Sequence, residues 1–171
     1  MWQPCTKETF MNCIEDLLAD EKVQAMNEIS QHTKSVSCFD HSLFVAYVSF
    51  FICKKFNLDF KSAARAGLLH DLYLCDWNAL RLGRFKRLLI HPQMALTNAE
   101  CFGLSDLEKD IIENHMWPIT LLHIPQHRES FVVNIADKLC AAAEMLHLYH
   151  IFRSKDVLKA FGATDSALSQ A

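Results

Sequence analysis

The sequence contains little glycine and little proline, with four residues of each in a chain of 171. An all-β protein needs many tight turns, which depend on these two residues, so an all-β fold is not expected. The sequence also lacks the patterns G-x-x-x-x-G-K, G-x-G-x-x-G and G-x-S-x-G. A P-loop enzyme, a dinucleotide-binding enzyme and a hydrolase with a serine triad therefore have no support.

Long apolar runs and a strong charge bias are also missing. The longest apolar candidate, "SLFVAYVSFFICKKF", falls short of the roughly 18 to 20 residues that cross a bilayer. The first residues, "MWQPCTKETF", do not follow the charged-then-apolar pattern of a secretory signal. The formal net charge is −3, and no basic stripe or acidic tail is present. We expect a cytoplasmic protein with no membrane partner and no long nucleic acid as a partner.

The seven cysteines are scattered, odd in number and form no C-x-x-C pair. This pattern argues against a disulfide framework and against a zinc ribbon. Most of the cysteines lie among apolar residues and are expected to be small buried side chains in a reducing cytosol.

Apolar residues recur at helical spacing along most of the chain. They predict helices near residues 7–20, 21–29, 40–56, 60–71, 92–102, 105–117, 130–147 and 155–161. No repeat, low-complexity stretch or linker divides the sequence, so we predict one all-α domain, a helical bundle, over residues 1–171. Residues 1–34 would form an N-terminal helical extension, residues 40–148 the core, and residues 162–171 a frayed tail.

Several residues predict where these helices begin or end. The expected N-caps are Asp40, Asp59 and Ser130, and "SDLE" from Ser105 to Glu108 matches a capping box. Pro92 suits the first turn of a helix, where its missing N–H is not needed. Gly103 suits the position after a helix, and Pro118 is expected to end the helix before it.

Ionisable residues interrupt these apolar helices. "RAGLLHDLYLCDW" places His70 and Asp71 at the end of an apolar helical run whose neighbouring positions are small or apolar. Asp137 lies in the middle of "SFVVNIADKLCAAAEML", with Val133 and Ala141 one turn to either side. An unpaired buried carboxylate costs several kcal/mol, so each aspartate needs a partner. Three histidines share this inward placement: His41, His91 and His115.

Each of these residues alone has an ordinary structural explanation. A single histidine on an apolar stripe is usually a hydrogen-bonded core residue, and a single buried aspartate is usually a cap or an ion-pair partner. Two aspartates and four histidines on inward surfaces would each need a separate partner. One shared divalent cation satisfies all of them, because it converts the desolvation cost into coordination bonds.

The order His41, then His70-Asp71, then Asp137 resembles the signature of the HD-domain superfamily of metal-dependent phosphohydrolases. The resemblance covers roughly residues 40–148, and "NIADKLCA" matches the context of the final aspartate. It implies an HD-type helical fold in which His41, His70, Asp71 and Asp137 are the core metal ligands.

"IHPQMAL" and "IIENHMWP" resemble the places where a subset of the superfamily adds two histidines, here His91 and His115. That subset holds two metals, with Asp71 as the bridging residue. "ENHMWPIT" lacks the double histidine and the GYP segment of the HD-GYP phosphodiesterases, so cyclic di-GMP is not the expected substrate. The sequence is more similar to stand-alone bacterial HD proteins.

The resemblance implies a hydrolase for a phosphomonoester or phosphodiester, a small phosphorylated molecule such as a nucleotide. A metal-activated water would attack phosphorus, with Asp71 as the central catalytic residue. One or two divalent ions are expected, and mixed nitrogen and oxygen ligands suit Mn²⁺, Fe²⁺ or Co²⁺, and also Mg²⁺, although the imidazoles disfavour Mg²⁺ at the tighter site.

Other residues are weaker candidates for contacts with the substrate or with the ligands. Lys138 would either reach the phosphate or pair within the protein, and Trp77 would either stack on a base or belong to the core. "RLGRFKR", residues 81–87, would be a solvated face or a rim that attracts phosphate. The side chains expected to orient the histidines are Asn134, Glu113 and Glu144.

Two other functions remain open. The same six-ligand pattern occurs in HD-type di-iron oxygenases, which would contain iron and consume oxygen. A non-catalytic module that senses a nucleotide through a retained metal site is the third interpretation. The sequence also leaves open whether the domain forms a homodimer.

Overall fold

The computed structural model describes residues 4–30, 36–75 and 83–146, and these residues form helices and no strand beyond a single Ser30–Ser37 bridge. The expected all-α class is confirmed. The helices are α1 (Pro4–Leu18), α2 (Glu21–Ala25), α3 (Cys38–Lys55), α4 (Phe60–Leu69), α5 (Arg84–Ala99), α6 (Asp106–Asn114) and α7 (Arg128–Met145), with 3-10 turns η1 (Met26–Glu28) and η2 (Glu100–Phe102).

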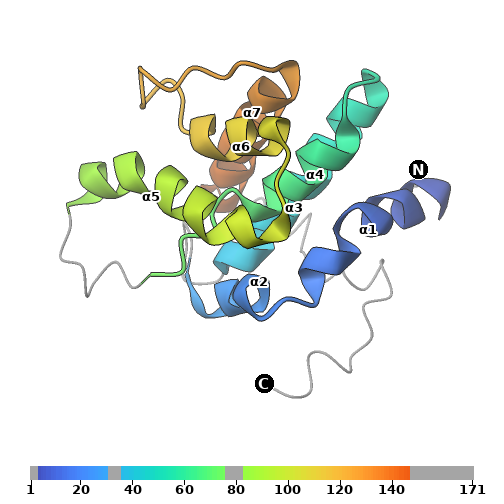
Figure 1. Ribbon diagram of the computed structural model, residues 1–171, viewed down its shortest axis with the longest axis horizontal. Helices are drawn as coiled ribbons and strands as arrows, with labels where there is room; N and C mark the ends of the chain where they lie inside the picture. Colours follow the sequence, from blue (N-terminus) through green and yellow to red (C-terminus); the bar gives the residue numbers. More distant parts are fainter. Residues whose placement is uncertain (1–3, 31–35, 76–82, 147–171) are drawn as a thin grey trace.

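Helices α3 and α4 form the centre of the molecule and pack most extensively against each other. Helix α7 packs on α3, α6 packs on α4 and α7, and α1 covers another side of α4 (Figure 1). Helix α5 lies on the side of the bundle away from α1 and packs against α6 (Figure 1). Phe10 and Ile14 of α1 are fully buried in the same hydrophobic cluster as Leu43 and Leu68, so the described N-terminal helix shares the core.

Several predicted helix ends are confirmed. Asp59 caps α4, because its carboxylate accepts the backbone N–H groups of Lys61 and Ser62. Ser105 and Glu108 form both hydrogen bonds of a capping box at the start of α6. Gly103 follows η2 with a φ of 65°, a left-handed conformation that glycine adopts without strain.

Two predicted helix starts are wrong. Helix α3 begins at Cys38, and its N-cap is Ser37, whose hydroxyl accepts the N–H of Asp40; the expected cap therefore lies inside the first turn. Helix α5 begins at Arg84, so Pro92 lies in its interior rather than in its first turn. Proline in a helix interior removes one backbone hydrogen bond. Helix α5 tolerates this loss because it packs against α6.

The boundaries around α6 and α7 also differ from those expected. Helix α6 ends at Asn114, before the turn that contains Pro118. Helix α7 begins at Arg128, so Ser130 lies in its first turn and donates its hydroxyl to Asp110 instead of capping the helix. The expected helix at 155–161 and the expected tail at 162–171 lie outside the described residues.

None of the described helices is long and apolar enough to cross a membrane. The cysteines with described side chains, 13, 38, 53, 75, 101 and 140, are all free thiols, in keeping with the absence of a disulfide pattern.

The close packing of α3 on α4 depends on Gly67. A Cβ atom on Gly67 would lie 2.9 Å from the Cα and 3.2 Å from the backbone nitrogen of Ala46 on α3. Both of these are backbone atoms, so the contact cannot be relieved by turning a side chain. The carbonyl of Gly67 also accepts the Nδ1–H of His70 over 2.8 Å, so the same residue positions the end of α4.

We therefore expect Gly67→Ala to push α3 and α4 apart. Overpacking costs typically about 1–3 kcal/mol, and a clash with backbone atoms falls at the upper end of that range. The higher helix propensity of alanine offsets about 1 kcal/mol, so the net loss should be about 2 kcal/mol. Chemical denaturation measures this loss. The control is Gly83→Ala, because nothing lies within 4 Å of a Cβ there, and its change should stay below about 1 kcal/mol. Equal stability of Gly67→Ala and wild type would show that the helices can separate without cost.

Asp110 joins α6 to the start of α7. Its carboxylate accepts hydrogen bonds from the backbone N–H of Gln126 at 3.0 Å, from Asn114 Nδ2 at 2.7 Å and from the Ser130 hydroxyl, and it lies 3.1 Å from His127 Nδ1. Burial would raise the pKa of Asp110, but the bonds from Ser130 and His127 outweigh it and lower the pKa below its ordinary value. The folded state therefore favours the ionised carboxylate.

Asp110→Asn should lower the free energy of unfolding by about 1–3 kcal/mol at neutral pH, because the hydrogen-bond donors around the Asp110 carboxylate would face a neutral amide in the variant. Since the folded pKa is depressed, the stabilisation is complete above the unfolded value of about 3.9 and is lost as pH falls through the folded pKa. The two proteins should converge in stability in that acidic range, as followed by denaturation at several pH values. The exposed Asp106→Asn is the control, and a constant gap down to the lowest pH would contradict the assignment.

Candidate metal centre

His70 and Asp71 stand where α4 ends. His70 is the C-cap of α4, and its Nδ1–H donates to the carbonyl of Gly67, so its Nε2 faces away from the helix. The backbone carbonyl of Asp71 accepts the N–H of Tyr73 at 2.8 Å and the thiol of Cys38 at 3.3 Å. Burial raises the pKa of the Cys38 thiol well above its ordinary value, which keeps the thiol protonated as a donor. These bonds fix the backbone that carries the two side chains.

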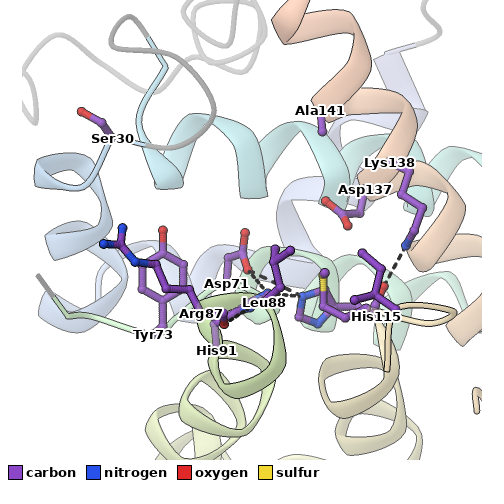
Figure 2. Close-up of a pocket in the computed structure, with 12 residues that line it drawn as sticks. Ser30, Asp71, Tyr73, Arg87, Leu88, His91, His115, Asp137, Lys138 and Ala141 are labelled. Atoms are coloured by element: carbon purple, nitrogen blue, oxygen red, sulfur yellow. Dashed lines mark hydrogen bonds and ion pairs between the residues drawn. The ribbon is translucent and has the colours of Figure 1, made fainter. Parts of the chain in front are cut away.

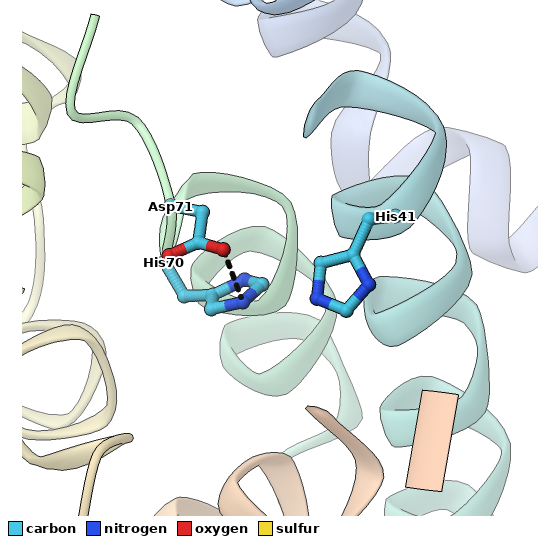
Figure 3. A group of neighbouring side chains, drawn as sticks. All are labelled: His41, His70 and Asp71. Atoms are coloured by element: carbon cyan, nitrogen blue, oxygen red, sulfur yellow. Dashed lines mark ion pairs between the residues drawn. The ribbon is translucent and has the colours of Figure 1, made fainter. Parts of the chain in front are cut away.

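His41 comes from the first turns of α3 and faces the His70–Asp71 pair (Figure 3). Its Nε2 lies 3.0 Å from Asp137 Oδ1, and its Nδ1 lies 2.8 Å from Glu144 Oε1. Asp137 and Glu144 are two turns apart on α7, so both carboxyl groups reach the same histidine. Asp137 Oδ1 is also 3.6 Å from His70 Nε2, which brings α3, α4 and α7 to one point.

His91 and His115 approach Asp71 from the other side. His91 lies on α5, and its Nδ1–H donates to the carbonyl of Arg87. His115 is the C-cap of α6, and its Nδ1–H donates to the carbonyl of Ile112. Their Nε2 atoms lie 3.4 Å and 3.7 Å from Asp71 Oδ1.

Asp71 therefore belongs to two groups of atoms that could hold a metal ion. One consists of His41, His70 and Asp71, and the other of Asp71, His91 and His115; the donor atoms within each group lie within 4.8 Å of one another. Oδ2 of Asp71 lies 3.5 Å from His70 Nε2, whereas Oδ1 faces His91 and His115. All six sequence-predicted positions meet here. Their role as ligands stays a prediction.

The hydrogen bonds of the histidines test whether a cation fits. The Nδ1–H groups of His70, His91 and His115 are used by carbonyls, so in the neutral rings each Nε2 presents a lone pair. His70 Nε2 is buried and has no hydrogen-bond partner among the described residues. The Nε2 atoms of His91 and His115 are 2.9 Å apart. Two lone pairs at that distance repel, whereas nitrogens about 2.0–2.1 Å from one metal at a right angle lie about 3 Å apart.

The charges of the cluster also favour a cation. Burial would raise the pKa of Asp71, but His70, His91 and His115 outweigh it and lower the pKa to about 2. Burial likewise opposes ionisation of Asp137, but its contact with His41 at 3.0 Å and the proximity of His70 bring its pKa well below the ordinary range. Both aspartates are therefore carboxylates at neutral pH, and a buried pair of carboxylates attracts positive charge.

His41 and His115 differ in protonation, because carboxylates contact His41 whereas burial and other histidines dominate around His115. Burial lowers the pKa of His41, but Asp137 and Glu144 outweigh burial and raise the pKa to about 10. A proton on His41 Nε2 thus occupies the position that a metal would take. Burial and the neighbouring His70 and His91 lower the pKa of His115 to about 3, so His115 is a neutral imidazole, the form that binds metals.

An open pocket of about 380 Å³ leads to the cluster (Figure 2). Asp71, His91, His115 and Asp137 line it together with the cationic residues Arg87 and Lys138. The rest of the lining is mostly apolar or aromatic: Ser30, Tyr73, Leu88, Met116, Ile119 and Ala141. The volume suits a small molecule rather than a polymer.

Lys138 lies in the pocket wall, but its ammonium group donates to the carbonyls of His115 at 3.0 Å and Asn134 at 3.3 Å. These bonds match the second of the two roles considered for it, a structural one. Trp77 lies outside the described residues. Arg87 comes from the basic stretch that was considered either a solvated face or a phosphate rim, and the structure places it at the pocket.

The side chains expected to orient the histidines divide into two kinds. Glu144 contacts His41 directly, and Asn134 Nδ2 donates to the carbonyl of His115 at 2.6 Å, which holds the end of α6. Glu113 instead lies 3.6 Å from His123 on the surface. Tyr73, which packs edge-on against His91, was not predicted; its position two residues after Asp71 was the available signal.

The comparisons with known proteins identify one family. The model of the HD domain matches residues 38–142, which span all six residues of the cluster. No curated protein and no solved structure gave a match.

Glu144 offers a test of the metal centre. A carboxylate on the far nitrogen of a metal-binding imidazole raises the basicity of that imidazole, and its loss typically lowers metal affinity 10–100-fold. Glu144→Gln keeps the shape and removes the charge, so we expect roughly tenfold weaker binding of Mn²⁺ in equilibrium dialysis. Glu113→Gln, which removes a charge away from the cluster, should leave the affinity unchanged. Equal affinities of both variants would show that Glu144 does not support a metal ligand.

Proposed function

The chain belongs to the HD-domain family, and from this membership we propose that it is a metal-dependent phosphohydrolase. Its substrate would be a small phosphomonoester or phosphodiester, nucleotide-like in size, attacked by a metal-activated water. The observation that carries the proposal is the convergence of four histidines and Asp137 around Asp71, at the base of a pocket. The superfamily contains many enzymes of this kind, which is the second support.

Each residue of the cluster has a distinct role in the proposal. His41, His70 and Asp137 would hold one divalent cation, and His91 and His115 would hold another. Asp71 would contribute Oδ2 to the first and Oδ1 to the second, because its two oxygens face the two sides. Bound cations would supply Lewis-acid chemistry, acidifying water and neutralising charge on phosphate oxygens.

The remaining chemistry follows from the protonation of these side chains. Asp71 has a pKa of about 2, so it is an acceptor and not a proton donor to the leaving group. Neutral His115, with its Nδ1–H held by a carbonyl, keeps its Nε2 lone pair directed into the cluster. Burial opposes a charge on His70, but Asp71 and Asp137 outweigh it and raise its pKa, so a cation at His70 Nε2 would replace a proton. Leu88, Met116 and Ile119 would cover the organic part of the substrate and exclude water from one side.

The proposal predicts the effect of Asp71→Ala. Because both groups share Asp71, this variant should contain less metal. Its rate of hydrolysis of a panel of nucleotides with Mn²⁺ should fall at least about a hundredfold, since the loss of a residue that only supports a ligand already lowers activity by up to about that factor. Metal analysis and phosphate release measure the two effects. Asp106→Asn, which removes an exposed carboxylate on α6, should keep both.

The outcome also separates the alternatives. A hydrolase should release phosphate without oxygen. Iron in the purified protein, oxygen uptake with substrate and no anaerobic phosphate release would instead indicate a di-iron oxygenase. Nucleotide binding without phosphate release across the panel would indicate a sensing module, and full activity of Asp71→Ala would remove the mechanism.

A further inference from the structure

Helix α7 is apolar on two opposite sides. Its inner side carries buried residues of the core, Val133, Ala136 and Cys140. The opposite side, called here the outer face of α7, is also apolar at every turn after the first and consists of Phe131, Ile135, Leu139, Ala142 and Leu146. A helix at the surface of a globular protein ordinarily presents polar residues to water, and a helix that is apolar all round is ordinarily buried.

The outer face of α7 is nevertheless exposed. The exposed fraction is 54% for Ile135, 60% for Leu139 and 68% for Leu146. Single exposed apolar residues are common on protein surfaces, but a continuous row of them along a helix indicates a surface that another body covers.

The charged residues of α7 lie away from this face beyond the first turn of the helix. Asp137 and Glu144 are buried and contact the histidine cluster. The ammonium group of Lys138 donates to the carbonyls at the end of α6 and in α7. The outer face of α7 therefore has no charge with which to select a partner.

The outer face is large enough for a specific contact. Met145, which is 59% exposed, borders one end of it, and Trp117 packs edge-on against Phe131 at the other end. At these exposed fractions the face presents on the order of 500 Å² of apolar surface, the size of the largest patch on a typical monomer. Two such faces packed together would bury roughly 1,000 Å², the area that a specific interface has to reach.

The absence of charge favours a second copy of this chain as the body that covers the face. Contacts between different proteins are about as apolar as the rest of the surface and use charge to choose the partner, whereas homodimer contacts are more apolar. A twofold dimer packs a patch against itself, so a charge near the axis would meet its own copy and repel it. The outer face of α7 meets this condition.

The order of the side chains also fits an antiparallel pairing of the face with itself. If Leu139 lies near the twofold axis, Ile135 of each copy lies opposite Ala142 of the other. Phe131 of each copy then lies opposite Leu146 of the other. Large side chains placed opposite small ones interdigitate, which lets two helices pack closely.

We propose that the protein is a homodimer in which the outer faces of α7 from two copies pack against each other, antiparallel about a twofold axis near Leu139. The sequence left the question of a homodimer open. The inference is independent of the proposed function, because the five residues of the outer face are neither in the cluster nor in the lining of the pocket.

Sedimentation equilibrium of the full chain over a range of concentrations tests the dimer. The wild-type protein should show twice the mass of one chain. Leu139→Glu should weaken the dimer at least about a hundredfold, because two like charges would meet inside the interface. Phe85→Glu is the matched control, since it makes the same kind of change at a side chain that is 67% exposed on α5, and it should keep the dimer.

A mixing experiment separates a lost contact from a misfolded variant. Leu139→Lys alone should also be monomeric, for the same reason as Leu139→Glu. An equimolar mixture of the two variants should form a heterodimer, because opposite charges would then meet near the axis. Failure of the two folded variants to associate when mixed would contradict the pairing at Leu139.

The other results overturn the proposal in distinguishable ways. A dimeric Leu139→Glu would show that the copies meet at another surface. A monomeric wild-type protein would show that the outer face has a different occupant. In that case, a lower stability of Leu139→Glu than of Phe85→Glu in chemical denaturation would indicate another segment of the same chain, and equal stability would indicate a different protein.

Discussion

The carboxylate of Asp71 is buried where side chains from helices α3 to α7 meet, and an ionised carboxylate in that position needs positive charge or donors on every side. Most features of the site follow from this requirement. His70 faces one oxygen and His91 and His115 face the other, so the two oxygens organise two groups of side chains that could hold a metal ion. Asp137 adds a second buried carboxylate to the first group, which makes the demand for a cation greater than the histidines alone would create. A centre of this kind is costly to fold as an empty cluster and favourable to fold around metal.

The geometry of this cluster depends on backbone contacts that lie one layer further out. Gly67 lets α3 approach α4, and its carbonyl also orients His70. Carbonyls of Arg87 and Ile112 do the same for His91 and His115, so three of the four histidines are oriented by the helix that carries them. Local orientation of this kind costs little entropy, because each ring is held by a carbonyl three or four residues earlier in its own helix. His41 is the exception, since it is oriented by Glu144 from another helix.

The difference between local orientation and orientation by another helix explains which parts of the site could be predicted from the sequence. His70, Asp71 and Asp137 interrupt apolar helical faces, so pattern alone marks them as buried and in need of partners, and the family resemblance supplied the order of all six residues. The pairing of His41 with Glu144 joins positions 103 residues apart, and nothing in local spacing specifies which carboxyl group crosses to which ring. Helix starts failed for a related reason. Ser37 and Asp40 are both good caps, and the choice between them depends on where α3 packs rather than on either residue.

Arg87 illustrates how the place of a residue in the fold depends on where its helix begins. In the sequence it is one of several basic residues in "RLGRFKR", and a solvated face was the simpler interpretation. Helix α5 begins earlier than expected, and this places Arg87 one turn before His91 instead of in a connecting loop. The position of Arg87 at the pocket could not be predicted from the basic run, because it depends on where α5 begins and on how that helix packs against α6.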